Sequence, residues 1–159
     1  DVTEEDGAQK VANHVREKFG TAHALVNNAG VLLDDDIKIA DVPVELVSKS
    51  FEINTLGPLR FIQAFLPFFK EANYGRIVNV SSALGCLHDM EGGTTGYKVS
   101  KTALNAVTRI VADEVKDLNI LVNSMSPGFC KTDMTGGDQS PATRTAEEGA
   151  ATAVFLATV

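Results

Sequence analysis

Residues 23–30 carry the sequence His-Ala-Leu-Val-Asn-Asn-Ala-Gly, and residues 76–82 carry Arg-Ile-Val-Asn-Val-Ser-Ser. Each stretch is a short apolar run that gives way to polar or small residues, which is the pattern of a buried parallel strand opening into a loop. Residues 120–125 predict a third strand. Helical patterns alternate with these strands, so the sequence predicts an α/β fold: a partial doubly wound, Rossmann-like parallel sheet in three α/β/α layers.

The first and last predicted helices have recognisable capping residues. Thr3 followed by Asp6 resembles a capping box, ahead of a helix that we expect to end near Gly20. Thr145, with Glu148 three positions later, predicts that the last helix starts at about residue 146.

Two longer helices are expected at residues 44–70 and 96–116. Pro58 and Pro67 should bend or interrupt the first of them, because proline lacks an N–H donor. A parallel sheet of only three strands would leave both edges open. We therefore expect residues 1–159 to be a single, incomplete domain of a larger fold.

The composition excludes several classes of partner. The net charge of −7 argues against nucleic-acid binding, because a phosphate backbone is bound by surplus Lys and Arg. No apolar run approaches the roughly 20 residues needed to cross a bilayer, and the acidic first residues are no secretory signal. We expect a cytoplasmic protein with neither nucleic acid nor membrane as a partner. The sequence favours neither a monomer nor a homo-oligomer.

No residue pattern predicts a metal site. Cys86 and Cys130 lack CxxC spacing; reduced thiols are the simpler interpretation, with a disulfide left open. The acidic run at residues 34–36 favours a solvated loop over a metal site. The histidines have no ligand partner at suitable spacing: His14, His23 and His88.

Tyr97 and Lys101 are the strongest indication of chemistry. They are spaced i and i+4 on a predicted helix, so both side chains project from one face. A phenol with a pKa near 10 is a poor acid-base catalyst at neutral pH, but an adjacent ammonium lowers that pKa. Such a tyrosine can exchange a proton with a substrate oxygen. Alone, the pair is more typical of a helix surface than of a catalytic site.

Polar and small residues follow each predicted strand. Ser82 ends the second strand, where open α/β sheets place ligand-binding residues, although it could simply cap the next turn. Residues 27–30 follow the first strand and could bind a flat ligand or form an Asx turn. Ser126-Pro127-Gly128 closes the third, with Thr132 shortly after. Because parallel strands end at one edge, we expect these groups to lie together.

Taken jointly, these motifs resemble the short-chain dehydrogenase/reductase family, in its order and across essentially the whole chain. The matching positions are Asn27-Asn28-Ala29-Gly30, Asn54, Ser82, Tyr97 with Lys101, and Pro127-Gly128. Three further stretches resemble the carbonyl-reductase and menthone-reductase branch: Ser81-Ser82, Leu104-Asn105-Ala106, and Lys131-Thr132-Asp133-Met134.

The resemblance implies a hydride transfer between a nicotinamide cofactor and a carbonyl or secondary alcohol. Tyr97 would be the general acid-base, and Lys101 would lower its pKa and bind the nicotinamide ribose. Ser82 would orient the substrate oxygen, and Asn54 would hold a water in a proton relay. The cofactor, NADP(H) rather than NAD(H), would contact Asp1, Val2, Asn27, Ala29, Gly30, Tyr97, Lys101, Pro127, Gly128 and Thr132.

The chain departs from this family in lacking the initial strand and glycine-rich turn that cradle the pyrophosphate, and also the last strand. We therefore expect the isolated chain to be inactive. Two alternatives stay open: a non-catalytic fragment or degenerate copy that does not bind cofactor, and a nucleotide-sugar epimerase or dehydratase. The latter shares the Tyr-Lys pair, but residues 27–30 and 127–128 favour the reductases.

Overall fold

The computed structural model describes all residues from 1 to 159. Three parallel strands form one sheet in the order β1-β2-β3, with β1 at Ala24–Asn27, β2 at Gly75–Val80 and β3 at Ile120–Met125. The predicted strands are thus confirmed. Since all three run the same way, the loops that follow them leave from one edge of the sheet.

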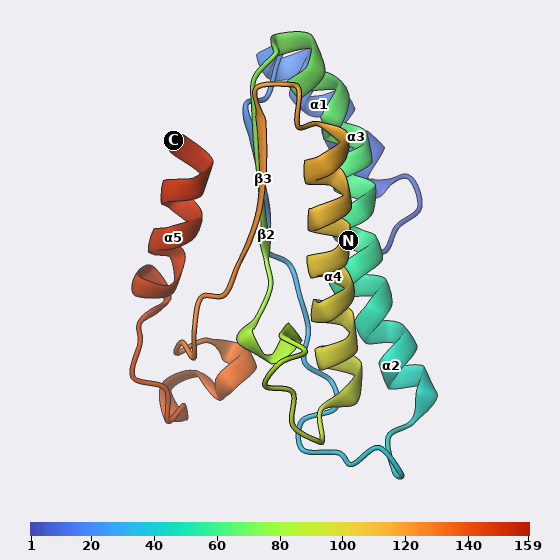
Figure 1. The fold of residues 1–159 in the computed structure, drawn as a ribbon, viewed down its shortest axis with the longest axis vertical. Coiled ribbons are helices and arrows are strands. Elements are labelled where there is room, and N and C mark those ends of the chain that lie inside the picture. Colours follow the sequence, from blue (N-terminus) through green and yellow to red (C-terminus); the bar gives the residue numbers. More distant parts are fainter.

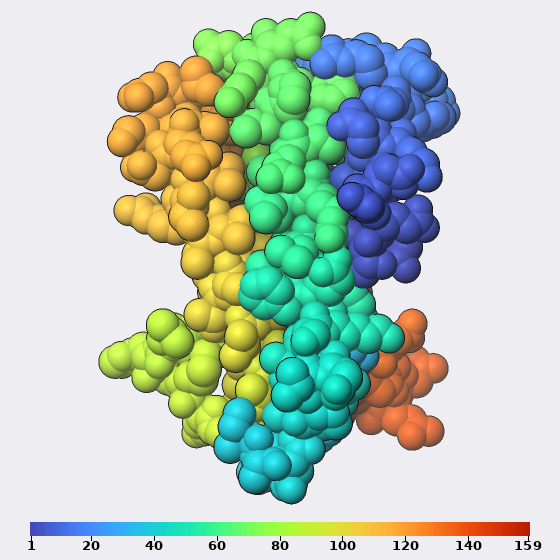
Figure 2. Space-filling model, turned by 90° about the vertical axis from the view of Figure 1, so that its right-hand side faces the viewer, coloured from blue at the N-terminus to red at the C-terminus, as the bar shows by residue number.

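Helices cover the two faces of the sheet unequally (Figure 1). One face carries α1 (Gly7–Phe19), α3 (Gly57–Ala72) and α4 (Thr95–Glu114), which lie side by side in Figure 2. The other face carries only α5 (Ala146–Thr158). The predicted α/β/α layering is confirmed, and none of the helices combines the length and hydropathy that crossing a membrane requires.

The main core lies between the sheet and α1, α3 and α4. β2 is buried along nearly its whole length because strands flank it on both sides and helices cover both of its faces. Burial on both faces explains why Ile77, Val78 and Val80 are apolar, while Arg76 and Asn79 are polar exceptions. Ten buried residues form this core: Ala12, Leu25, Ile62, Phe65, Phe68, Phe69, Ile77, Val111, Val115 and Ile120. Under α5 the core is much smaller, with Val78, Met125 and Ala153.

The capping box predicted at Thr3 and Asp6 is wrong. Thr3 donates from both its backbone N–H and its hydroxyl to the carboxylate of Asp1, at 2.9 and 3.0 Å, and Asp6 caps α1 without a side-chain bond. The Thr3 side chain is therefore bonded locally to Asp1 and does not cap α1. The box at Thr145 and Glu148 is confirmed, with bonds of 3.1 and 2.7 Å.

The helix predicted at residues 44–70 is interrupted, but not by its prolines. It consists of α2 (Val44–Phe51), a π-helical turn at Glu52–Leu56, and α3. Pro58 lies in the first turn of α3, where a missing N–H donor does no harm. Pro67 lies inside α3 without ending it, because the buried phenylalanines around it hold the helix on the sheet.

We predict that Ile77→Ala lowers the free energy of unfolding by about 2 to 5 kcal/mol, because Ile77 is fully buried in β2 and the shortened side chain leaves a cavity. The matched variant is Ile110→Ala, which removes the same atoms from a side chain that is 57% exposed and should change stability by less than about 0.5 kcal/mol. Urea unfolding followed by far-UV circular dichroism measures both. Equal losses would contradict the assignment of the core.

Candidate active site

The loops after β2 and β3 meet at the carboxyl edge of the sheet, as predicted. Ser81 donates its backbone N–H to the carbonyl of Met125 at 2.8 Å. The hydroxyl of Ser126 accepts from the backbone N–H groups of Ala83, at 3.1 Å, and Gly128, at 3.4 Å. These bonds set the Pro127-Gly128 turn beside the end of β2, next to Ser82.

Tyr97 lies in the first turn of α4 and is only 9% exposed. Burial raises the pKa of the Tyr97 phenol above its ordinary value, and a hydrogen bond with the hydroxyl of Ser82 opposes this rise. Ser82 is thus near enough to the phenol to influence its pKa. The phenol keeps its proton at neutral pH, because removing it would leave a charge in a poorly solvated place.

Lys101 follows one turn later on the same face of α4 and is 3% exposed. Its Nζ donates to the carbonyl of Val80 at 2.7 Å and lies 5.7 Å from the centre of the Tyr97 ring. Burial lowers the pKa of Lys101 to about 8. The expected lowering of the Tyr97 pKa by this amine is wrong for this structure, because burial disfavours the charged form of both groups and dominates the shift.

Asn54 lies in the π-helical turn and is fully buried. Its Nδ2 donates to the carbonyl of Val31 at 2.9 Å and to the hydroxyl of Ser100 at 3.0 Å, while its Oδ1 accepts from the N–H of Val31 at 2.8 Å. The side chain thus clamps the loop after β1 to α4. A Cβ on Gly30 would lie 3.2 Å from Asn54 Oδ1 and 3.4 Å from Lys101 Nζ, so these three residues meet at one point.

Asn27 is the first member of a buried polar chain that sequence reasoning missed. Its Nδ2 donates to Oδ1 of Asn79 at 2.8 Å, and Asn79 Nδ2 donates to the hydroxyl of Thr108 at 2.9 Å. The chain therefore runs from β1 across β2 to α4, and it fixes the strand end that precedes the Asn28-Ala29-Gly30 loop. The signal in the sequence was Asn79 itself, a polar residue amid the apolar run of β2.

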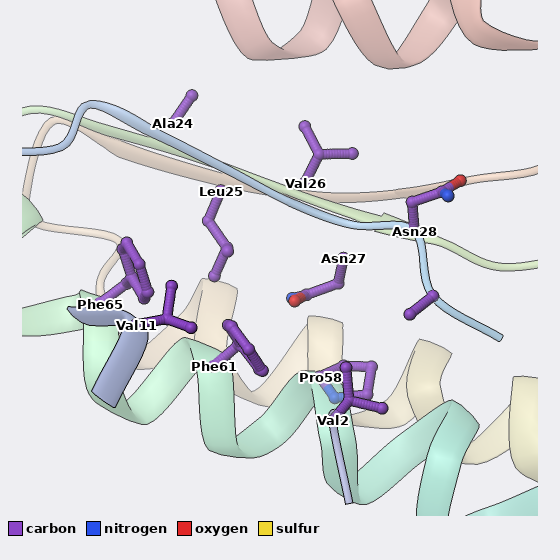
Figure 3. Close-up of a pocket in the computed structure, with 11 residues that line it drawn as sticks. Val2, Val11, Ala24, Leu25, Val26, Asn27, Asn28, Pro58, Phe61 and Phe65 are labelled. Atoms are coloured by element: carbon purple, nitrogen blue, oxygen red, sulfur yellow. The ribbon is translucent and has the colours of Figure 1, made fainter. Parts of the chain in front are cut away.

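Three of the residues expected to contact the cofactor, Val2, Asn27 and Ala29, lie along the free edge of β1. Figure 3 shows a pocket of about 280 Å³ there, with Leu25 and Asn27 pointing towards α3 while Ala24 and Val26 point towards the opposite face. It brings Val2 together with residues 27–29, as the resemblance implies. Asp1 is exposed and bonded to Thr3. The lining comprises Val2, Val11, Ala24, Leu25, Val26, Asn27, Asn28, Ala29, Pro58, Phe61 and Phe65.

The Pro127-Gly128 turn packs on α5. Gly149 of α5 lies against it, since a Cβ there would come within 3.3 Å of the Pro127 side chain. Gly128 has a φ of 78°, in the left-handed region that favours glycine. Thr132 does not join this turn: it caps a separate 3₁₀ turn at Asp133–Thr135 and is exposed.

The acidic run at residues 34–36 contains a residue that sequence reasoning misplaced. Asp35 and Asp36 are exposed, as a solvated loop requires, but Asp34 is fully buried. Its carboxylate accepts backbone N–H bonds from Gly96 and Tyr97 at the start of α4. Nothing local reveals this contact, because the partners are more than 60 positions apart.

Known proteins share this arrangement. Residues 1–143 match the short chain dehydrogenase family. The short-chain dehydrogenase anuI of Penicillium roqueforti is 32% identical over 99% of this chain and 66% of its own length.

Two solved carbonyl reductases superpose on the whole chain and on 68% of their own lengths. The carbonyl reductase Sniffer of D. melanogaster has a TM-score of 0.87 at 26% identity. The NADPH-bound carbonyl reductase from chicken fatty liver has a TM-score of 0.85 at 29% identity. This chain thus spans about two thirds of the length of these proteins. With the strand ends, the buried Tyr97-Lys101 pair and Ser82 in place, the chain belongs to the short chain dehydrogenase family.

Proposed function

We propose that the protein carrying these residues transfers a hydride between NADP(H) and a carbonyl compound or secondary alcohol. The observation that carries this proposal is the burial of the Tyr97 phenol and the Lys101 amine on one face of α4, with Nζ 5.7 Å from the centre of the Tyr97 ring and Ser82 at the end of the neighbouring strand. These groups can bind one substrate oxygen and supply its proton. The carbonyl-reductase neighbours support the substrate class.

The raised pKa of Tyr97 keeps the phenol protonated, so that it has a proton to give, although it also makes the phenol a weaker acid. At neutral pH it holds its proton, so in the direction of carbonyl reduction it donates that proton to the substrate oxygen. Ser82 holds the same oxygen through a second hydrogen bond. Lys101, whose pKa of about 8 lies close to neutral pH, can resupply the proton to the site after each turnover.

The residues around Gly30 suit the nicotinamide-ribose half of a dinucleotide. A Cβ on Gly30 would crowd Asn54 Oδ1 and Lys101 Nζ, so glycine lets the main chain lie close to the amine, which can donate to a ribose hydroxyl. When bound, the cofactor would supply the hydride. The NADPH of the chicken carbonyl reductase supports NADP(H). The other proposed contacts with the cofactor would come from Val2, Asn27, Ala29, Pro127 and Gly128. Asp1 and Thr132, which are exposed, would contact it from the surface.

The alternative of a chain that does not hold the cofactor by itself is supported by the free edge of β1. The pocket beside this edge is lined mostly by apolar side chains, and no glycine-rich turn within the 159 residues provides N–H groups for a pyrophosphate. We propose that these residues alone bind NADPH weakly. Saturable micromolar binding in a fluorescence titration would contradict this. The relatives named above are dehydrogenases and reductases, which supports the reductase proposal over the epimerase alternative.

We predict that Tyr97→Phe lowers carbonyl-dependent oxidation of NADPH by about 10² to 10⁴-fold, because the proton donor is lost. The assay uses the chain joined to a glycine-rich strand–turn–helix of its family, and follows NADPH absorbance. Cofactor affinity should stay nearly unchanged. Tyr74→Phe is the matched control, since Tyr74 is half-buried beside Arg76 and should tolerate the same change. Substantial turnover in Tyr97→Phe would refute the acid-base assignment.

We predict that Lys101 makes the free energy of unfolding rise with pH between about 8 and 10.5. The folded chain releases the Lys101 proton near pH 8, whereas the unfolded chain keeps it up to the ordinary value of 10.5. The unfolded state therefore binds more protons in this window, so stability grows as pH rises. Relative to Lys101→Met, the parent chain should gain on the order of 3 kcal/mol across the window in urea unfolding.

The control for this pH series is Lys116→Met, in which the same change is made to an exposed ammonium that undergoes no burial. Its difference from the parent chain should show no comparable rise. A difference between parent and Lys101→Met that is flat, or falls with pH, would show that Lys101 is not buried as the structure has it.

A further inference from the structure

The first turn of α4, which carries Tyr97, has no local cap. Thr94, the residue before α4, has a φ of 52° and a ψ of 44°, in the left-handed region, and its side chain makes no capping bond. The first N–H groups of a helix have no partner within the helix and need acceptors from elsewhere, especially where they are buried. Gly96 and Tyr97 are both buried.

Asp34 provides these acceptors from a distant loop. Its Oδ2 accepts from the N–H of Gly96 at 2.5 Å, and its Oδ1 accepts from the N–H of Tyr97 at 3.2 Å. A carboxylate in this place also interacts favourably with the positive end of the helix dipole. Asp34 is fully buried, so both bonds are shielded from water.

The packing around Gly96 leaves room for this carboxylate and for nothing more. A Cβ on Gly96 would lie 3.0 Å from Cα of Val47, 3.2 Å from the Ser50 hydroxyl and 3.3 Å from Asp34 Oδ2. The start of α4 is therefore pressed between α2 and the Asp34 loop. A shift of the loop would move the helix start with it.

The loop that carries Asp34 is fixed at both ends. At its beginning, Val31 is bonded through its N–H and its carbonyl to the Asn54 side chain. At its end, Thr94 donates its N–H to the carbonyl of Ile37 at 3.2 Å, and its hydroxyl accepts from the N–H of Asp36 at 3.3 Å. Asp34 is thus tied to the same clamp that orders the loop after β1.

We propose that Asp34 is a positioning residue, which fixes the first turn of α4 so that the phenol of Tyr97 lies against the Ser82 hydroxyl. The kinetic part of this inference rests on the proposed function, but the placement of the phenol does not. Of the charged groups near Tyr97 on α4, Lys98 donates to the carbonyls of Glu91 and Gly92, and Lys101 to that of Val80. Only Asp34 bonds the backbone of Tyr97's own turn from another segment.

The chain offers a direct readout, because it contains two tyrosines and no tryptophan. In a Tyr74→Phe background, the absorbance of the ionised phenol reports Tyr97 alone. We expect Asp34→Ala to move the titration midpoint of Tyr97 down towards its ordinary value, since a loosened first turn lets water reach the ring. Asp34→Asn retains one acceptor oxygen and should have a smaller effect of the same sign.

Two controls separate positioning from a general loss of stability. Asp35→Asn makes the same chemical change at an exposed neighbour and should leave the midpoint unchanged. Ile77→Val destabilises the core away from the first turn of α4 and should also leave the midpoint unchanged, with far-UV circular dichroism confirming the fold at each pH. If Asp34→Ala fails to fold, Asp34→Asn against Asp35→Asn decides the question.

An unchanged midpoint in the folded Asp34 variants, or an equal shift in Ile77→Val, would overturn the proposal. In the active protein, Asp34→Asn should lower kcat on the order of 10 to 100-fold while the KM for the cofactor stays nearly constant. The titration needs no turnover, so it still decides the role of Asp34 if the proposed reductase activity proves wrong. Full kcat in Asp34→Asn alongside an active parent would reject the positioning role alone.

Discussion

The bond from the Lys101 ammonium to the carbonyl of Val80 holds the site together. It joins the face of α4 that carries Tyr97 to the last residue of β2, through an amine whose pKa burial lowers to about 8. A neutral hydrophobic residue would pack there at lower cost. The amine is buried in a place that disfavours its charge, which supports the chemical role proposed for it rather than a stabilising one.

A second polar element runs through the core a few residues away. The chain from Asn27 through Asn79 to Thr108 replaces apolar contacts in the centre of the sheet with hydrogen bonds whose geometry is fixed. Such bonds contribute little net stability but specify one arrangement of neighbours. Here they align β1, β2 and α4, the three elements from which the proposed cofactor and substrate residues come.

Much of this arrangement could be predicted from the sequence. The strands at residues 24–27, 75–80 and 120–125 were evident from apolar runs, and Ser82 and Tyr97 were found from strand ends and helical spacing. These features depend on neighbours in the chain. The resemblance to a known family added Asn54, whose place in a π-helical turn no periodicity had shown.

What sequence reasoning missed involves partners far apart in the chain. Asp34 was predicted to be part of a solvated acidic run. Nothing in the neighbouring sequence indicates that its carboxylate accepts hydrogen bonds from α4, more than 60 residues later. The predicted direction of the Tyr97 pKa shift was wrong for a similar reason. Spacing shows that an amine is nearby, but only the packed structure shows how deeply both groups are buried.

The π-helical turn at Glu52–Leu56 has a further consequence. Each α-helical residue advances the side chains by about 100°, and a wider turn holds one residue more, so the apolar stripes before and after it point in different directions. α2 accordingly packs on α4, whereas α3 packs on the sheet and on α1. The two halves of one continuous helical segment thus pack against different partners. Substitutions in α2 can therefore change its contacts with α4 while the contacts by which α3 builds the core stay the same.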